Sequence, residues 1–268
     1  MDLAAVIGGW PVGSSSVAVI GPDGILDLFD DGQRHRWASV TKIATALTVL
    51  DACLDGVVGL EVPAGPDGST LRHLLAHASG IAMDSDDVLA APGARRIYSN
   101  RGIEIAAQTL ESLSGNTFAD ELRDRVLEPL EMAGCTLDGS PAHGMSGDIT
   151  DLAALAAELL NPRQSLPGVI PALSTLAFPG LPGVLPGFGR QQHNDWGLGC
   201  EIRNGKSPHW TCAQNSPATF GHFGQSGSFL WVDPDARLAC VSLSDTAFGE
   251  WAGLAWPELA AQVLAGYG

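Results

Sequence analysis

Ser39 and Lys42 are the first residues whose types and spacing could do chemistry, because they stand three apart in the segment Ser-Val-Thr-Lys. On a helix, side chains at this spacing share one face, one turn apart. A serine hydroxyl is a weak nucleophile until a neighbouring group takes its proton, and a lysine can take it when burial or nearby cations lower its pKa. Arginine cannot, and the chain strongly prefers arginine to lysine. On its own, so short a pattern more often marks an N-capping serine beside a surface lysine, so the interpretation needs further residues.

A second group of candidates stands at Tyr98-Ser99-Asn100, where a helix is predicted to begin. A phenol beside a lysine ammonium can have its pKa lowered, so Tyr98 could serve as general base for the serine and then as acid to the leaving group. The amide of Asn100 could orient the lysine or a substrate carbonyl. Taken alone, the segment would be interpreted as an aromatic packing residue followed by an N-cap.

A third segment, residues 221–227, places His222, Gly224 and Gln225 in a strand-rich part of the chain. Glycines in a strand let the backbone approach a ligand closely. A strand edge beside a nucleophilic serine can donate one backbone N–H to an oxyanion, and the N–H of the serine itself supplies the other. Taken alone, the segment fits a β-bulge with a surface histidine.

Strands at both ends of the chain and helices between them must position these residues. Apolar residues recur at helical spacing after Ser39, and a Pro-Asp-Gly turn joins two short apolar strands before it. An antiparallel sheet built from both termini, with a helical insertion, satisfies this order best. The predicted helices cover residues 41–54, 69–78, 100–113, 117–127, 149–160 and 251–264, and the predicted strands cover 16–20, 25–29, 196–203, 219–222, 228–233 and 237–242.

The predicted fold class is therefore α/β of the α+β type, an antiparallel sheet flanked by helices and joined to a mostly helical inserted domain. The sheet-containing domain would comprise residues 1–55 and 191–268, and the helical domain residues 56–190. Prolines and glycines punctuate residues 161–190, a stretch that is too apolar for a free linker. We expect it to be an ordered irregular segment with one or two short helical turns, covering another part of the molecule.

The charge of the chain limits its partners. A formal net charge of −16 repels phosphate backbones and anionic headgroups, so nucleic acids and membrane surfaces are expected to be poor partners. The N-terminus lacks the basic region and the long apolar run of a signal peptide, and no stretch approaches 18 uninterrupted apolar residues. A cytoplasmic location is expected.

The sequence indicates no metal and no cofactor. The five cysteines, at positions 53, 135, 200, 212 and 240, form no C-x-x-C pair, so buried thiols are expected; whether Cys200 and Cys212 pair across a hairpin stays open. His73 and His77 form H-x-x-x-H without the metalloprotease glutamate, so packing or capping explains them better than zinc. The chain has no G-x-G-x-x-G, Walker A or G-x-S-x-G motif.

Together and in this order, these segments resemble the serine β-lactamase-like superfamily, which holds class C β-lactamases, D,D-peptidases and many serine esterases. The resemblance extends over nearly the whole chain and includes the hairpin before Ser39. Its most specific stretch is Thr70 to Gly80, which has no evident chemistry that would recur by chance. The motifs that carry it are Ser39-Val40-Thr41-Lys42, Thr70-Leu71-Arg72-His73-Leu74-Leu75-Ala76-His77-Ala78-Ser79-Gly80, Tyr98-Ser99-Asn100, Gly221-His222-Phe223-Gly224 and Leu230-Trp231-Val232-Asp233-Pro234.

The resemblance implies roles for these residues. Ser39 matches the nucleophile and Lys42 its base or electrostatic partner, while Tyr98 matches the acid/base tyrosine and Asn100 the amide beside it. Family members that hydrolyse β-lactams carry Lys-Thr-Gly as the third motif, where this chain has His222-Phe223-Gly224. A His-x-Gly version is similar to the esterase and peptidase branches. Gln225 would then supply the second N–H to the oxyanion.

The favoured function is a serine hydrolase that forms an acyl-enzyme on Ser39 with a small-molecule ester, amide or lactam. We rank esterase above peptidase or amidase, and those above β-lactamase, because of His222 and because peptidoglycan enzymes must be exported. Two other classes stay open: a biosynthetic acyltransferase, with residues 161–190 excluding water, and a non-catalytic ligand-binding protein on the same fold.

Overall fold

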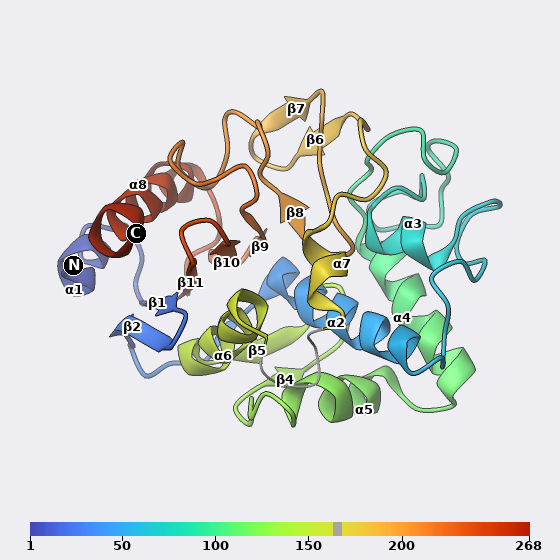
Figure 1. Cartoon of the computed structure of the whole chain (residues 1–268), viewed down its shortest axis with the longest axis horizontal. Helices are drawn as coiled ribbons and strands as arrows, with labels where there is room; N and C mark the ends of the chain where they lie inside the picture. The colour runs from blue at the N-terminus through green and yellow to red at the C-terminus, as the bar shows by residue number, and fades with distance from the viewer. Residues whose placement is uncertain (163–167) are drawn as a thin grey trace.

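The computed structural model describes residues 1–162 and 168–268 and is built around one antiparallel sheet drawn from both ends of the chain (Figure 1). Its strands in these residues are β1 Ser15–Gly21, β2 Gly24–Phe29, β8 Glu201–Ile202, β9 Phe220–Gly224, β10 Ser228–Asp233 and β11 Leu238–Ser244. They pair in the order β2-β1-β11-β10-β9-β8. The N-terminal β1 pairs with the near-C-terminal β11, with Ser15 opposite Ser244 and Ile20 opposite Ala239. The predicted sheet of both termini is confirmed.

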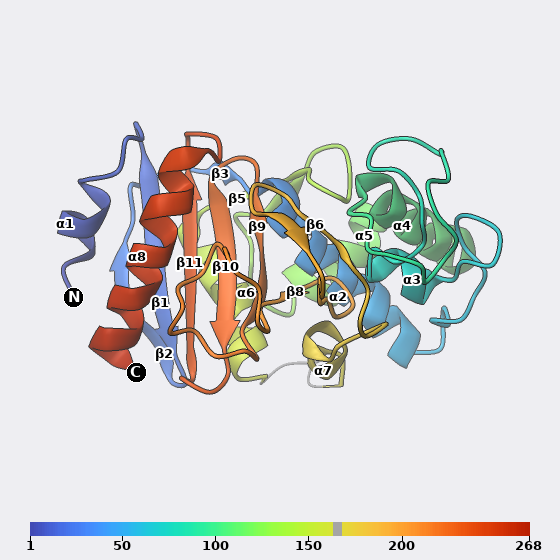
Figure 2. The ribbon, with the colours of Figure 1, turned by 90° about the horizontal axis from the view of Figure 1, so that it is seen from above.

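Helices cover both faces of this sheet. Along β1, alternate side chains point to opposite faces, so Val17 and Val19 pack with α8 (Glu250–Tyr267), which lies across one face in Figure 2. Ala18 and Ile20 point the other way and share a core with α6 (Ile149–Leu160). The short α1 (Leu3–Ile7) joins the α8 side.

The helix that follows the candidate serine, α2 (Thr41–Leu54), runs through the middle of the molecule (Figures 1 and 2). Nearly every residue of its first three turns is buried, including the polar Thr41, Lys42, Thr45 and Thr48. A helix that is buried all round fits a central position between layers. It ends where predicted, with Gly56 in the left-handed region at φ +73°. Around it lie α3 Leu71–Leu75, α4 Asn100–Ser114 and α5 Phe118–Leu122, the last continuing as a π-helical turn, Arg123–Leu127.

Two predictions about local structure need correction. The predicted strand 196–203 shrinks to β8, because Gly199 adopts φ +105° and the backbone N–H of Gly197 bonds to Cys200 O, which folds residues 196–200 into a tight loop. The predicted helix 69–78 is only α3, since His77 turns to φ +54° and ends it. The division into two domains at residues 55/56 and 190/191 stays a prediction.

The Pro/Gly-rich segment is ordered over its described part, residues 168–190. One short helix, α7 (Ile170–Ser174), agrees with the predicted helical turns, and it is followed by a hairpin of β6 (Gly183–Leu185) and β7 (Gly189–Gln191) that was not predicted. Residues 163–167 of the segment lie outside the described residues. The remaining elements are a small sheet of β3 His35–Arg36, β4 Thr136–Leu137 and β5 Met145–Gly147, and a 3-10 turn, η1, Ala38–Val40.

All five cysteines are free thiols, so Cys200 and Cys212 do not pair. Among the helices of the described residues, none combines the length and the apolar character needed to cross a bilayer.

Candidate active site

Ser39 lies in the turn η1 directly before α2, where the chain is held tightly. Ala38 adopts φ +44°, a left-handed conformation that costs a non-glycine residue energy and is found at functional sites. Ser228 on β10 donates a hydrogen bond to Trp37 O at 2.7 Å, which fixes the same turn from the sheet side. A Cβ added to Gly224 would lie 2.5 Å from Trp37 O, so only glycine lets β9 pass this close to the serine. Gly224 thus lies directly against the turn that holds Ser39, while its predicted approach to a ligand stays a prediction.

Lys42 is fully buried one turn behind Ser39, and its Nζ has three oxygen neighbours. They are Ser39 Oγ at 3.2 Å, Asn100 Oδ1 at 2.7 Å and Ala142 O at 2.9 Å. Burial lowers the pKa of Lys42 to about 7, while the charges of Asp84 and Glu104 oppose that shift. A neutral amine has two N–H groups and one lone pair. Asn100 Oδ1 and Ala142 O accept the two N–H groups, so the lone pair is left for the Ser39 hydroxyl.

Asn100 is the first residue of α4 and lies where the sequence placed it. Ser99 caps the helix, since its Oγ accepts from Gly102 N at 2.8 Å. The amide of Asn100 faces two ways: Oδ1 accepts from Lys42, and Nδ2 donates to Asp84 Oδ1 at 2.8 Å. Sequence analysis did not identify Asp84, which carries no motif and lies in a loop.

Tyr98 lies beside Ser39 and Lys42, but its ionisation differs from the prediction. Lys42 Nζ lies 4.8 Å from the centroid of the Tyr98 ring, so the amine faces the ring. Burial raises the pKa of Tyr98 well above its usual value, and a hydrogen bond with Ser39 only partly offsets this. The expected lowering of the Tyr98 pKa is therefore wrong. At neutral pH the group is a phenol that can donate a proton.

His222, on β9, completes the group around Tyr98. Its Nδ1 lies 2.7 Å from Phe223 O, an acceptor only, so the proton is assigned to Nδ1 and Nε2 is left as an acceptor. Nε2 lies 3.4 Å from Tyr98 OH. Burial, together with the charge of Lys42, lowers the pKa of His222 to about 3, so the imidazole is neutral near pH 7. Trp196 packs edge-on against the ring, at 5.4 Å between ring centroids.

These side chains open into one cavity of about 740 Å³. Ser39, Tyr98, Asn100, His222 and Gln225 all line it, so the structure brings these predicted site residues together. The Gln225 side chain donates to Phe248 O at 3.2 Å. The apolar part of the wall includes Met83, Leu185, Pro186, Trp196 and Phe223.

His73 and His77 serve packing and capping, as predicted. His73 Nδ1 lies 2.9 Å from Thr70 Oγ1 at the start of α3. His77 Nδ1 accepts the backbone N–H of Ser99 at 3.2 Å, and its ring packs on Tyr98 at 4.6 Å between centroids. Within residues 1–162 and 168–268, no cluster of three His, Cys, Asp or Glu side chains could hold a metal ion.

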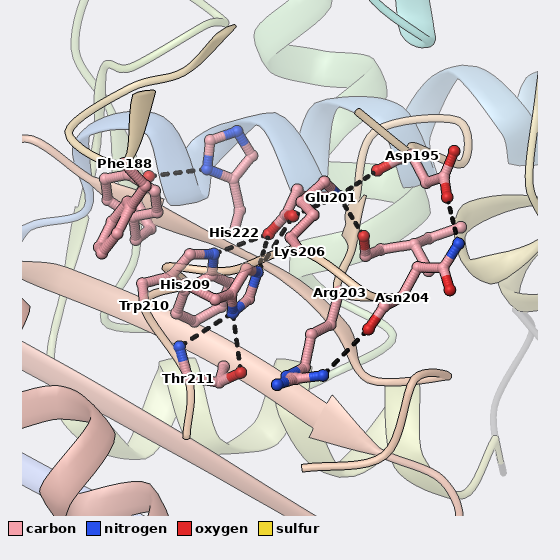
Figure 3. Close-up of polar contacts among 12 residues, drawn as sticks. Phe188, Asp195, Glu201, Arg203, Asn204, Lys206, His209, Trp210, Thr211 and His222 are labelled. Carbon is pink, nitrogen blue, oxygen red and sulfur yellow. Dashed lines mark hydrogen bonds and ion pairs between the residues drawn. The ribbon is translucent and has the colours of Figure 1, made fainter. Parts of the chain in front are cut away.

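A buried ion pair that no motif predicted includes Glu201, which is among the residues that line the cavity (Figure 3). Glu201 on β8 pairs with Lys206 Nζ at 2.6 Å, accepts from Trp210 Nε1 at 2.7 Å and contacts His209 Nε2 at 3.0 Å. Because the backbone N–H of Thr211 donates to His209 Nδ1, the proton of this imidazole is assigned to Nε2 and points at Glu201. Burial acts to raise the pKa of Glu201, but the charge of Lys206 and the hydrogen bonds from Lys206 and His209 outweigh it and hold that pKa well below its usual value. Lys42 and Lys206, the two lysines of the chain, are therefore both buried.

Comparison with known proteins agrees with the resemblance seen in the sequence. A family model described as Beta-lactamase matches residues 15–265. The chain is 50% identical to a β-lactamase from Mycobacterium bovis whose crystal structure is known, over 98% of each chain, with a TM-score of 0.95.

More distant structures share the fold alone. The octameric penicillin-binding protein homologue from Pyrococcus abyssi is 18% identical, with a TM-score of 0.78 over 99% of this chain and 78% of that one. EstCE1, a hydrolase with promiscuous acyltransferase activity, is 18% identical, with a TM-score of 0.75 over 96% and 95%. Since a family model matches most of its length and a solved relative is half identical from end to end, the chain belongs to the beta-lactamase family.

Proposed function

We propose that the protein is a serine hydrolase that forms an acyl-enzyme on Ser39 and acts on small-molecule carboxyl esters. The set of partners around Lys42 carries this proposal. Two oxygen acceptors take the N–H groups of a neutral Lys42, so its lone pair faces Ser39 Oγ at 3.2 Å. A pKa of about 7 makes the neutral form available near neutral pH, which is what a general base needs.

In the proposed acylation step, Lys42 Nζ takes the proton of Ser39 while Ser39 Oγ bonds to the ester carbonyl carbon. The carbonyl oxygen becomes an oxyanion, and the backbone N–H groups of Ser39 and Gln225 are the donors proposed for it. When the ester C–O bond breaks, the leaving oxygen takes a proton from the Tyr98 hydroxyl, and the proton on Lys42 replaces it. The products are acyl-Ser39 and an alcohol.

In the proposed deacylation step, water attacks the acyl carbon and gives its proton to Lys42. The bond between Ser39 Oγ and the acyl carbon then breaks, and Ser39 Oγ takes that proton back. A carboxylic acid leaves and the free enzyme returns. Because the raised pKa keeps the phenol of Tyr98 protonated in the free enzyme, its proposed part is that of a proton donor to the leaving group.

His222 is the reason for ranking esters above β-lactams. It stands where the β-lactam-hydrolysing members carry the lysine of Lys-Thr-Gly, and its pKa of about 3 leaves it neutral. The residue at this position thus carries no fixed positive charge. The apolar walls contributed by Met83, Leu185 and Trp196 favour an uncharged acyl group. The relative from Mycobacterium bovis, described as a β-lactamase, makes lactam hydrolysis the alternative to test.

The test is the intact mass of the protein after brief exposure to p-nitrophenyl acetate and, separately, to a penicillin. We expect one acetyl group on the wild type and none on Ser39→Ala. Ser226→Ala is the matched control, because Ser226 lines the same cavity and its hydroxyl is engaged with Arg36 O. An adduct that persists in Ser39→Ala would contradict the proposal.

The rates at which the protein turns over the ester and the penicillin then identify the reaction. Faster hydrolysis of the ester than of the penicillin is expected, and the reverse ranking would make the protein a β-lactamase. Added alcohols test acyl transfer: an ester product that outweighs the free acid would indicate an acyltransferase. If no reagent gives an adduct or turnover, a non-catalytic binding protein is favoured.

A further inference from the structure

Asp84 lies outside the cavity lining but is joined to Ser39 through two side chains. Its Oδ1 accepts from Asn100 Nδ2 at 2.8 Å, Asn100 Oδ1 accepts from Lys42 Nζ at 2.7 Å, and Lys42 Nζ lies 3.2 Å from Ser39 Oγ. We propose that Asp84 is a positioning residue: its carboxylate fixes the amide of Asn100 so that the oxygen, and not the NH₂ group, faces Lys42. The inference rests on the proposed function and names a residue that the motifs do not include.

The direction of the amide matters because the two ends of an asparagine side chain have opposite hydrogen-bonding character. With Oδ1 toward Lys42, a neutral Lys42 donates to it and keeps its lone pair for Ser39. If the amide turned over, its NH₂ group would donate to that lone pair and compete with Ser39. A carboxylate can only accept, so Asp84 selects the orientation in which Nδ2 points away from Lys42.

Asp84 is exposed, but the backbone beside it is tied to the start of α4, which keeps its carboxylate within reach of Asn100. Met83 O accepts from Arg101 N at 3.0 Å, and Ala82 O accepts from Ser99 Oγ at 2.6 Å. Within the described residues, Asp84 forms no ion pair with a cation. Its charge is therefore available to act on Lys42.

Other charged and titratable groups near Lys42 also influence its protonation, in addition to Asp84. Glu104, on α4, accepts from Ser140 Oγ at 2.6 Å, and Ser140 Oγ accepts from Ala142 N at 3.1 Å, so a second carboxylate supports the other oxygen partner of Lys42. Arg101 lies 3.8 Å from Glu104 and offsets part of its charge. His77 and His222 also face Lys42, and burial with the charge of Lys42 lowers the pKa of both, so they add no positive charge near pH 7.

Two substitutions separate the charge of Asp84 from its hydrogen bond. Asp84→Asn removes the negative charge and keeps an oxygen that can accept from Asn100 Nδ2. Asp84→Ala removes both. Asp86→Asn is the matched control, because Asp86 is an exposed carboxylate of the same loop that pairs with Arg101 at 2.6 Å and has no contact with Asn100.

The experiment follows the pH dependence of two reactions of Ser39: kcat/KM for a p-nitrophenyl ester and the rate of phosphonylation by a fluorophosphonate. Both need neutral Lys42, so both rates rise as pH increases through the Lys42 pKa. The Asp84 carboxylate stabilises the charged amine, so its loss lowers that pKa and moves the rise to lower pH.

We expect Asp84→Asn to keep the plateau rate within about threefold of the wild-type rate. The rise in rate should move to lower pH by about half a pH unit, and this shift should be smaller at high salt. Asp84→Ala should lose about tenfold or more in kcat with a smaller change in KM. Asp86→Asn should match the wild type. The thermal unfolding midpoint of each variant is measured as well. If Asp84→Ala loses activity but keeps the wild-type midpoint, the loss of activity is assigned to positioning.

The inference is overturned if Asp84→Asn and Asp84→Ala both match Asp86→Asn in plateau and pH profile. It is also overturned if Asp84→Ala loses activity only in proportion to its unfolded fraction. A wild type that reacts with neither reagent would contradict the serine hydrolase itself, which is a different result from reactive variants that are indistinguishable.

Discussion

The hydroxyl of Tyr98 lies 3.4 Å from His222 Nε2, on the side of the imidazole that carries no proton. Because His222 Nδ1 donates to Phe223 O, Nε2 accepts, and Tyr98 is the donor of the pair. A raised pKa keeps the Tyr98 phenol protonated, and a pKa of about 3 keeps His222 neutral. The two groups therefore hold one proton between them at a point beside Ser39, where a leaving group would need it.

Tyr98→Phe tests whether that proton serves the leaving group. p-Nitrophenolate leaves without protonation, whereas an alkoxide needs a proton. We expect kcat/KM to fall about 100-fold or more for an alkyl ester and by much less for p-nitrophenyl acetate. The check is the ratio of the two losses, measured on one enzyme preparation. Equal losses on both esters would mean that Tyr98 activates Ser39 instead.

His222→Ala should change substrate preference more than the reactivity of the serine. The imidazole and Trp196 form a wall of the cavity, and Lys42 already supplies the base in our account. We expect KM to rise for bulky esters, while phosphonylation by a small fluorophosphonate stays within about threefold of wild type. If phosphonylation collapses, His222 belongs to the proton-transfer machinery.

The ion pair of Glu201 and Lys206 predicts a stability effect. Lys206→Met leaves a buried carboxylate without its cation and should cost about 3–5 kcal/mol, whereas the double variant Glu201→Gln/Lys206→Met should cost much less. Urea unfolding of the single and double variants measures both. A double variant that loses at least as much stability as Lys206→Met would show that the pair is not coupled.

The same pair predicts a dependence of stability on pH. The pKa of Glu201 is lower in the folded protein than in the unfolded chain, so its stabilisation is present above the ordinary glutamate pKa and is lost as pH falls through the lower, folded value. The free energy of unfolding of wild type should therefore fall more steeply below about pH 4.5 than that of the double variant. Parallel curves would contradict this.

Sequence patterns predicted the features of the structure that neighbouring residues in the chain determine. Three-residue spacing predicted that Ser39 and Lys42 lie one turn apart, and they do, although Ser39 belongs to η1 and only Lys42 to α2. The helix predicted from Asn100 begins there, but its N-cap is Ser99 and not Asn100. The hairpin of β1 and β2 followed from alternation and a turn. These features are encoded by neighbours in the chain, so pattern and propensity reach them.

The features that were missed depend on contacts between distant segments. Asp84 reaches Asn100 from a loop, and Glu201 meets Lys206 and Trp210 only after β8 and the next turn fold together. The predicted lowering of the Tyr98 pKa was wrong because the sequence does not show how deeply the phenol is buried. Desolvation then outweighs the expected charge effect.

The central claim is that neutral Lys42 takes the proton of Ser39, and the pH dependence of Ser39 acylation tests it most directly. Stopped-flow release of p-nitrophenolate gives the acylation rate of wild type and of Lys42→Arg between pH 5 and pH 9. We predict that the wild-type rate rises with a midpoint near pH 7, and that Lys42→Arg loses about 10³-fold or more, because a guanidinium stays protonated over this range. A Lys42→Arg variant that acylates at a rate near wild type, with the same midpoint, would contradict the account.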